Sequence, residues 1–208
     1  MSRFIKRLFD IVASLAALII LLPLFVLIAL AIKVDNPGPV FFRQERAGFR
    51  GKSFIIYKFR TMIVGAEKKG AGVFVENNDS RITRVGTLLR KISMDELPQL
   101  INIFKGEMSL VGPRPTLPYQ IDNYDQRQRG RLVVKPGMTG WAQVNGRSSL
   151  TWPERIKLDL WYIENRSLWL DLKIIVKTFG VVLGKSNLYK PDVYDPISGQ
   201  KPENSSDN

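Results

Sequence analysis

Two adjacent carboxylates, Asp95 and Glu96, are the strongest candidates for chemistry in this sequence. Arg90 and other cations flank them, so we expect both carboxyl groups to have a lowered pKa and to stay ionised. An ionised carboxylate can bind Mg²⁺ or attack an electrophile. The structural alternative is a helix cap. Ser93-x-x-Glu96 fits a capping box ahead of the helical pattern at 95–104, and sequence statistics alone favour that alternative.

Cations suited to a phosphorylated ligand occur in two further segments. Arg114 lies between Pro113 and Pro115, which restrict the backbone and thereby fix the direction of a guanidinium for bidentate phosphate binding. Lys58 and Arg60 share one face of a predicted strand, and two cations on one face suit a diphosphate. The structural alternatives are a solvent-facing arginine in a turn and a solvated strand face.

A glycine-rich segment at 135–147, KPGMTGWAQVNGR, has the composition of a ligand-binding loop. Its glycines allow the backbone to approach a ligand closely. Trp141, Gln143, Asn145 and Arg147 are suited to stack on or hydrogen-bond a base or a sugar. The segment matches neither the phosphate-binding P-loop pattern nor the dinucleotide-binding glycine pattern, so neither function is predicted from it.

Composition excludes several kinds of catalysis. The 208 residues include no cysteine and no histidine, which excludes disulfides, thiol nucleophiles, Cys/His zinc sites and imidazole acid–base catalysis. The chain carries 31 Lys and Arg against 19 Asp and Glu, a formal net charge of +12. Such a charge implies an anionic partner, which composition alone leaves open among nucleic acid, acidic lipid and phosphorylated small molecules.

The uncharged run at 11–32 is long enough to cross a hydrocarbon core of about 30 Å. Lysines and arginines lie on both sides of it, and the positive-inside rule then places both flanks in the cytoplasm. Pro23, near the middle of the run, interrupts helical hydrogen bonding. We therefore favour a re-entrant helix–break–helix. The alternatives are a spanning helix with a proline kink and a cleaved signal peptide.

The rest of the chain predicts an α+β, mostly helical fold with a small β element. We expect a membrane-associated segment at 1–33, a compact cytosolic domain at 34–190 and a polar, frayed tail at 191–208. The four tryptophans fall between 141 and 169 beside basic residues, which suits amphipathic helices at a membrane interface, although ordinary core packing is the alternative. The predicted strands are 40–42 and 54–59, and the predicted helices are 82–92, 95–104, 121–132, 152–165 and 168–183.

Taken together, the motifs resemble those of the bacterial sugar transferases. These are the small monotopic phosphoglycosyl transferases, also called polyprenyl-phosphate sugar-1-phosphate transferases. The resemblance covers residues 3–183 in the family's order. It rests on the proline-broken membrane segment and on KFRTM, LRKISMDELPQL, KGEMSLVGPRP, PGMTGWAQVNGR and LDLWYIENRSLWLDLKII.

The resemblance implies transfer of a sugar-1-phosphate from a UDP-sugar to undecaprenyl phosphate, with release of UMP. This reaction takes place at the cytoplasmic face of the bacterial inner membrane and starts polysaccharide or glycoprotein assembly. The mechanism implied is ping-pong, through a covalent aspartyl phospho-sugar intermediate, and it requires Mg²⁺. The implied partners are the UDP-sugar, undecaprenyl phosphate and membrane lipids. An oligomer is possible.

By the same resemblance, Asp95 is the nucleophile and a Mg²⁺ ligand, and Glu96 is its partner in metal binding or in positioning the acceptor. Asp159 or Asp171 completes the site, with Asp159 preferred. The sequence departs from many relatives at Pro23, which follows a leucine where they have a serine. The implied phosphate contacts are Lys58, Arg90 and Arg114, and Arg60, Gln143 and Arg147 are further substrate-binding candidates.

Two other functions are compatible with parts of this sequence. A membrane-tethered nucleic-acid-binding module would use the net charge of +12, but no recognised nucleic-acid motif is present and the cations are spread along the chain. A non-catalytic scaffold would keep the fold without the chemistry. The co-occurrence of the carboxylate pair with the PRP and KFR motifs argues against a scaffold, because no structural need requires all three.

Overall fold

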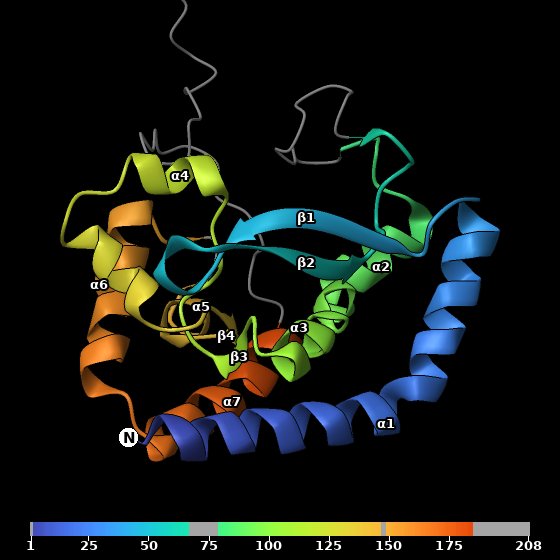
Figure 1. The fold of residues 1–208 in the computed structure, drawn as a ribbon. Helices are drawn as coiled ribbons and strands as arrows, with labels where there is room; N and C mark the ends of the chain where they lie inside the picture. The colour runs from blue at the N-terminus through green and yellow to red at the C-terminus, as the bar shows by residue number, and fades with distance from the viewer. Residues whose placement is uncertain (1, 67–78, 147–148, 185–208) are drawn as a thin grey trace, which may run out of the picture.

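The computed structural model describes residues 2–66, 79–146 and 149–184. This part of the chain is mostly helical, with small strand pairs and one long apolar helix at the N-terminus (Figure 1). The predicted tail at 191–208 lies outside the described residues.

Helix α1 (Arg3–Asp35) contains the whole apolar run. Figure 1 shows it bent into two arms, and Pro23 is the proline within it. A proline bends a helix because it removes a backbone hydrogen bond and clashes with the preceding turn. The predicted break is therefore a bend within a continuous helix. In the described residues α1 is the one helix long and apolar enough to cross a membrane, which is consistent with a membrane-associated protein.

Both ends of α1 are attached to the remainder of the fold. At the N-terminal end, Lys6 Nζ lies 2.6 Å from Asp171 Oδ2 of α7, and Asp10 accepts hydrogen bonds from the first residues of β3. At the C-terminal end, the carboxylate of Asp35 accepts a hydrogen bond from the backbone N–H of Val85. The arms also pack into different parts of the core: residues 17–21 against Leu100 and Ile103 among others, and residues 24–32 against Phe59 and Leu89.

One surface of the molecule exposes large apolar side chains. In α1 they recur along both arms, and in α7 they include Trp169, which is 76% exposed. Figure 1 shows the start of α7 beside the N-terminal end of α1. Exposed apolar patches of this kind mark interaction surfaces, here of the type expected for contact with lipid. The exposed apolar residues of the two helices are Phe4, Ile5, Leu8, Phe9, Val12, Leu15, Ile19, Ile20, Leu22, Val26, Leu27, Leu30, Val34, Leu168, Trp169, Leu172, Val176 and Phe179.

The main strand pair is an antiparallel hairpin of β1 (Phe41–Ala47) and β2 (Ser53–Phe59), joined through the short 3₁₀ turn η1 (Phe49–Gly51). Strand β1 is longer than the predicted 40–42, because backbone pairing with β2 also holds its polar residues in an extended conformation. A second, parallel pair of β3 (Ser109–Val111) and β4 (Gly137–Thr139) was not predicted. Each strand has three residues, which is too short to give an alternating pattern.

Two predicted helices are each divided. The segment 95–104 consists of the 3₁₀ turn η3 (Met94–Glu96) and helix α3 (Gln99–Lys105), separated at a proline that has no N–H to donate. The segment 121–132 consists of α4 (Pro118–Asp122) and the 3₁₀ segment η4 (Gln128–Val133). Helices α2 (Arg84–Lys91), α6 (Trp152–Asn165) and α7 (Leu168–Leu183) lie where the sequence predicts them, and a short helix α5 (Trp141–Val144) follows β4.

The tryptophans do not share one environment. Trp169 is largely exposed and Trp161 is 42% exposed, as an interfacial role requires. Trp141 stacks on Trp161 with ring centroids 5.0 Å apart, and Trp152 packs against the core. Core packing is therefore confirmed for Trp152, and an interfacial role stays a prediction for the exposed Trp169.

Candidate active site

The turn η3 positions the two carboxylates, and it does so without the predicted capping box. Ser93 at its start has φ 55°, in the left-handed region, and its side chain makes no capping hydrogen bond. The side chain of Glu96 turns instead toward Lys58 and Arg114. The capping interpretation is therefore wrong, and the carboxylates of Asp95 and Glu96 both line a cavity.

Glu96 joins cations that are distant in sequence. Lys58 Nζ of β2 lies 2.7 Å from Glu96 Oε1, and Arg114 Nη2 lies 2.6 Å from the same oxygen. Burial by itself raises the pKa of Glu96, but Arg114 and Lys58 together lower it more, so the pKa lies well below its ordinary value. Glu96 in turn raises the pKa of Arg114. This carboxylate stays ionised and holds both cations in place.

Asp95, its neighbour, has the opposite environment. Among the described residues no hydrogen bond or ion pair engages its carboxylate, so its oxygens are open to a ligand. Burial raises the pKa of Asp95, Lys58 opposes this, and the adjacent charge of Glu96 raises it further. The expectation that cations lower the pKa of both carboxyl groups is thus right for Glu96 and wrong for Asp95. A partly desolvated, unpaired carboxylate is a better nucleophile than a salt-bridged one.

Arg90 approaches the carboxylates from α2. Its Nε donates to the Thr61 hydroxyl over 2.7 Å, which aims the guanidinium, and its charge lowers the pKa of Asp95. The helix lies close enough for this because it has a glycine at its contact with the chain after β2. A Cβ at Gly86 would be 2.1 Å from the Thr61 carbonyl oxygen. Lys58, Arg90 and Arg114 therefore converge on the carboxylate pair as the sequence predicts.

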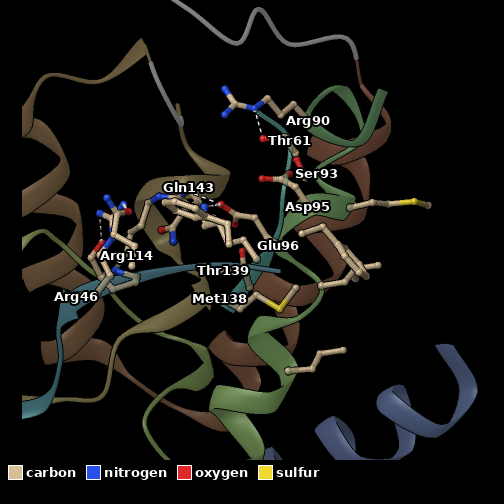
Figure 2. A pocket seen from close by; sticks show the side chains of 18 of the residues that line it. Arg46, Thr61, Arg90, Ser93, Asp95, Glu96, Arg114, Met138, Thr139 and Gln143 are labelled. Atoms are coloured by element: carbon tan, nitrogen blue, oxygen red, sulfur yellow. Dashed lines mark hydrogen bonds and ion pairs between the residues drawn. The ribbon is translucent and has the colours of Figure 1, made fainter. Parts of the chain in front are cut away.

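A cavity of about 1710 Å³ contains this cluster. Figure 2 shows Asp95 and Glu96 side by side, with Arg90 and Thr61 at one end and Arg114 and Arg46 at the other. The cavity continues to an apolar part lined by the arms of α1 and by the second half of α7. It thus joins a charged region, suited to phosphates, to an apolar region that adjoins the exposed apolar surface.

The remaining predicted site residues lie around this cluster rather than in it. Asp159 lines the cavity but is 1% exposed, and its carboxylate is 2.7 Å from Arg131 Nη2. Burial raises the pKa of Asp159 against the opposing charge of Arg131. The Arg131 guanidinium also donates to the Arg114 backbone carbonyl. Asp159 therefore supports the Arg114 loop through Arg131.

Asp171 and Arg60 secure α1. Asp171 pairs with Lys6 and accepts a hydrogen bond of 2.6 Å from the Tyr162 hydroxyl, outside the cavity lining. The Arg60 guanidinium donates to the Asn36 side chain and backbone. Between the two acidic candidates, the structure thus brings only Asp159 to the cavity, and it does not bring Arg60 to the carboxylates. Arg147 lies outside the described residues.

Among the described residues that line the cavity, Arg46, Arg60 and Gln143 have buried polar atoms without a hydrogen-bond partner. Gln143 was a sequence candidate, and both atoms of its side-chain amide are buried without a hydrogen-bond partner among the described residues. Arg46 was missed, because it lies beyond the predicted end of its strand. In the structure, exposure alternates along β1, and Gln44 and Arg46 are less exposed than Arg43 and Glu45.

A family model for bacterial sugar transferases matches residues 1–185. The chain belongs to this family. It is 45% identical over 179 residues to an uncharacterized sugar transferase, EpsL, of Bacillus subtilis, covering 86% of this chain and 87% of that protein.

Other relatives of this bacterial sugar transferase are longer proteins with named activities. The undecaprenyl-phosphate galactose phosphotransferase of Salmonella typhimurium is 41% identical over 202 residues, covering 90% of this chain and 42% of the relative. The UDP-glucose:undecaprenyl-phosphate glucose-1-phosphate transferase of Escherichia coli is 43% identical over 185 residues, covering 85% and 40%. The chain thus spans less than half the length of these two relatives.

In this sugar transferase, one carboxylate at the site is available to bind Mg²⁺. Among the described residues no group of three or more acidic side chains forms a metal cluster. Mg²⁺ is commonly held by one or two carboxylates together with substrate phosphates and water. Asp95 is open for this role, whereas the Glu96 carboxylate is already neutralised by Lys58 and Arg114. The residues present therefore fit an ion that Asp95 and the phosphates of a ligand hold together.

Proposed function

We propose that this chain transfers a sugar-1-phosphate from a UDP-sugar to undecaprenyl phosphate by a ping-pong mechanism with Asp95 as nucleophile. The observation that carries the proposal is the Asp95 carboxylate itself, which lies in a cavity beside Lys58, Arg90 and Arg114 and is unpaired within the described part of the chain. Membership of the family and the named activities of the Salmonella and Escherichia relatives support the choice of substrates.

In the first step a carboxylate oxygen of Asp95 attacks the β-phosphorus of the UDP-sugar. The bond from that phosphorus to the bridging oxygen breaks, and UMP leaves with its electron pair. Phosphoryl transfer depends mostly on positioning and charge stabilisation, which cations provide without histidine. Lys58 and Arg114 each keep N–H donors that Glu96 does not use, so they bind the phosphate oxygens while Glu96 fixes their positions. Mg²⁺, when bound, neutralises charge on the diphosphate.

In the second step an oxygen of undecaprenyl phosphate attacks the same phosphorus. The bond to Asp95 breaks, and the carboxylate is restored as the diphosphate-linked sugar leaves. Asp95 takes part in both steps, as the nucleophile in the first and as the leaving group in the second, so the two substrates occupy the site in turn. The apolar part of the cavity, lined by α1 and α7, supports entry of the lipid from the membrane side.

This reaction needs a monotopic arrangement at the cytoplasmic face of the inner membrane, because nucleotide sugars are cytosolic and the acceptor is a lipid. We propose that α1 dips into one leaflet and returns. Its bend, and the attachment of both its ends to the same domain through Lys6 and Asp35, support this. A straight spanning helix would separate its two ends by about 30 Å of hydrocarbon.

The experiment is a UMP-release assay with the purified chain, undecaprenyl phosphate, Mg²⁺ and a panel of UDP-sugars. We expect release from at least one sugar, loss of release with a chelator, and a loss of at least ~10³-fold in Asp95→Asn. Asp122→Asn, a change at an exposed carboxylate of α4, is the matched control and keeps wild-type activity. Release by none of the sugars, or full activity of Asp95→Asn, would refute the proposal.

A further inference from the structure

Arg46 is a half-buried cation in the cavity that forms no ion pair with any described residue. Its Nη2 donates to the Gln44 side-chain oxygen over 2.6 Å, and its Nη1 reaches the Pro115 carbonyl at 3.5 Å. Its Nε is buried with no hydrogen-bond partner. Burial, and then the charge of Arg114, lower the pKa of Arg46 to about 10. The fold thus holds a charge there at an electrostatic cost.

The other cations nearby are already matched. Arg114 is paired with Glu96, and Arg131 is paired with Asp159. Arg46 forms no ion pair with any residue the structure describes, and the charges of Glu96 and Tyr119 offset only part of the cost of its burial. A buried charge without a partner is expensive, which makes it a strong site for an anionic ligand group.

Gln143 adds a second unmatched group in the same cavity. The amide nitrogen and oxygen are both buried and unpartnered within the described chain. Each such group costs free energy until a ligand supplies its hydrogen bond. Figure 2 shows Gln143 and Arg46 toward the end where Arg114 lies, with Glu96 between them and Asp95. An anion site and an amide that can pair with a base edge therefore lie on the side away from the nucleophile.

We propose that Arg46 binds the phosphate of the nucleoside monophosphate that leaves in the first step, and that Gln143 hydrogen-bonds its base. This inference rests on the proposed function. In an in-line displacement the attacking and leaving oxygens lie on opposite sides of the phosphorus. With Asp95 on one side, the leaving phosphate falls on the side where Arg46 supplies charge. Arg46 thus binds the phosphate of the leaving group, while Lys58 and Arg114 bind the phosphate that is transferred.

The test is equilibrium binding of UMP and of uridine to the full chain in detergent, with no turnover required. We expect Arg46→Met to weaken UMP at least tenfold and to leave uridine unchanged, so that the preference for UMP over uridine disappears. Arg46→Lys retains part of the preference. Gln143→Leu weakens UMP and uridine by the same factor. Arg50→Met removes an exposed arginine from the adjoining turn and is the matched control.

Wild-type affinity for UMP in Arg46→Met overturns the inference, and so does an equal loss of UMP and uridine, which would mean a structural role. Absence of UMP binding by the wild-type chain also overturns it. The proposed function is judged separately, by UMP release from the panel of UDP-sugars. If the chain releases UMP normally but binds it independently of Arg46, the proposed function stands and this inference is refuted.

Discussion

At the scale of single residues, Asp95 and Glu96 show how two adjacent carboxylates acquire different roles. Glu96 is held by Lys58 and Arg114, and its pKa is lowered. Asp95 is unpaired among the described residues, and its pKa is raised, chiefly by burial. Environments that push two pKa values apart are a common basis for dividing catalytic roles. Here the paired carboxylate organises the cations and the unpaired one remains reactive.

The dependence of kcat/KM on pH tests this division, because it reports groups of the free enzyme. Only ionised Asp95 attacks, and its pKa is raised, so activity is lost on acidification at a higher pH than the ordinary aspartate value of about 3.9 implies. Glu96→Gln removes a charge that raises the pKa of Asp95, so the residual activity of this variant falls off at a lower pH. An unchanged acid limb in Glu96→Gln would contradict the coupling.

Stability gives an independent check on Asp95. Because its pKa is raised on folding, keeping it ionised above that pKa costs stability. Asp95→Asn therefore raises the Tm at pH 7, by about 2–4 °C for each kcal/mol gained, and the gain shrinks as the pH falls toward about 4. Thermal unfolding of the two proteins across pH measures this. A lower Tm of Asp95→Asn at pH 7 would show that the carboxylate is structural.

The sequence predicted which residues meet at the carboxylate pair, but not all of their contacts. The prolines around Arg114 and the strand position of Lys58 made both residues candidates, and only the family resemblance assigned them to the phosphates. Arg46 escaped prediction because β1 reads as polar beyond residue 42, and its pairing with β2 is not visible in its own sequence. Glu96 fits a capping box in sequence, and only tertiary contacts show that its side chain turns elsewhere.

At the scale of elements, the site depends on short segments meeting closely. The helical spacing of apolar residues predicted α2, α6 and α7 correctly. The same spacing continues through 95–104, so it did not predict that η3 and α3 are separate. That separation lets the carboxylates face the cavity instead of capping a helix. The parallel β3–β4 pair includes part of the glycine-rich segment at 135–147, and it could not be predicted because its partners are far apart in the sequence.

The packing of α2 on the chain after β2 yields a sharp test. Gly86→Ala places a Cβ 2.1 Å from a backbone carbonyl oxygen, which no side-chain rearrangement relieves, so we expect a loss of at least ~2 kcal/mol in unfolding free energy and weaker activity through Arg90. Gly180→Ala in α7 is the matched control, since nothing lies within 4 Å of its Cβ. It gains up to ~1 kcal/mol from helix propensity. Equal effects of the two changes, measured by chemical denaturation, would contradict this packing.

At the scale of the whole molecule, α1 packs into the core and also exposes large apolar side chains. Its two ends are attached to the same domain, and α7 exposes apolar side chains as well. The sequence predicted a proline-interrupted apolar segment, and it could not predict the ion pair between Lys6 and Asp171, because those residues are far apart in the chain. The net charge of +12 favours an anionic membrane surface and phosphorylated ligands.

The absence of native cysteine allows the topology to be measured by labelling. Cysteines placed at Ser2, before α1, and at Asn123, an exposed position after α4, lie on the same side of the membrane if α1 re-enters. A membrane-impermeant maleimide then labels both in inside-out vesicles and neither in intact spheroplasts. Labelling of the two positions from opposite sides would show that α1 spans the membrane.

The most direct test of the central claim is intact-protein mass spectrometry after incubation with Mg²⁺ and a UDP-sugar, without lipid acceptor. We predict a mass increase equal to one sugar phosphate, located on Asp95 by peptide mapping. It is absent from Asp95→Asn and is removed when undecaprenyl phosphate is added. Turnover that leaves Asp95 unmodified, or an adduct that persists in Asp95→Asn, would contradict the account.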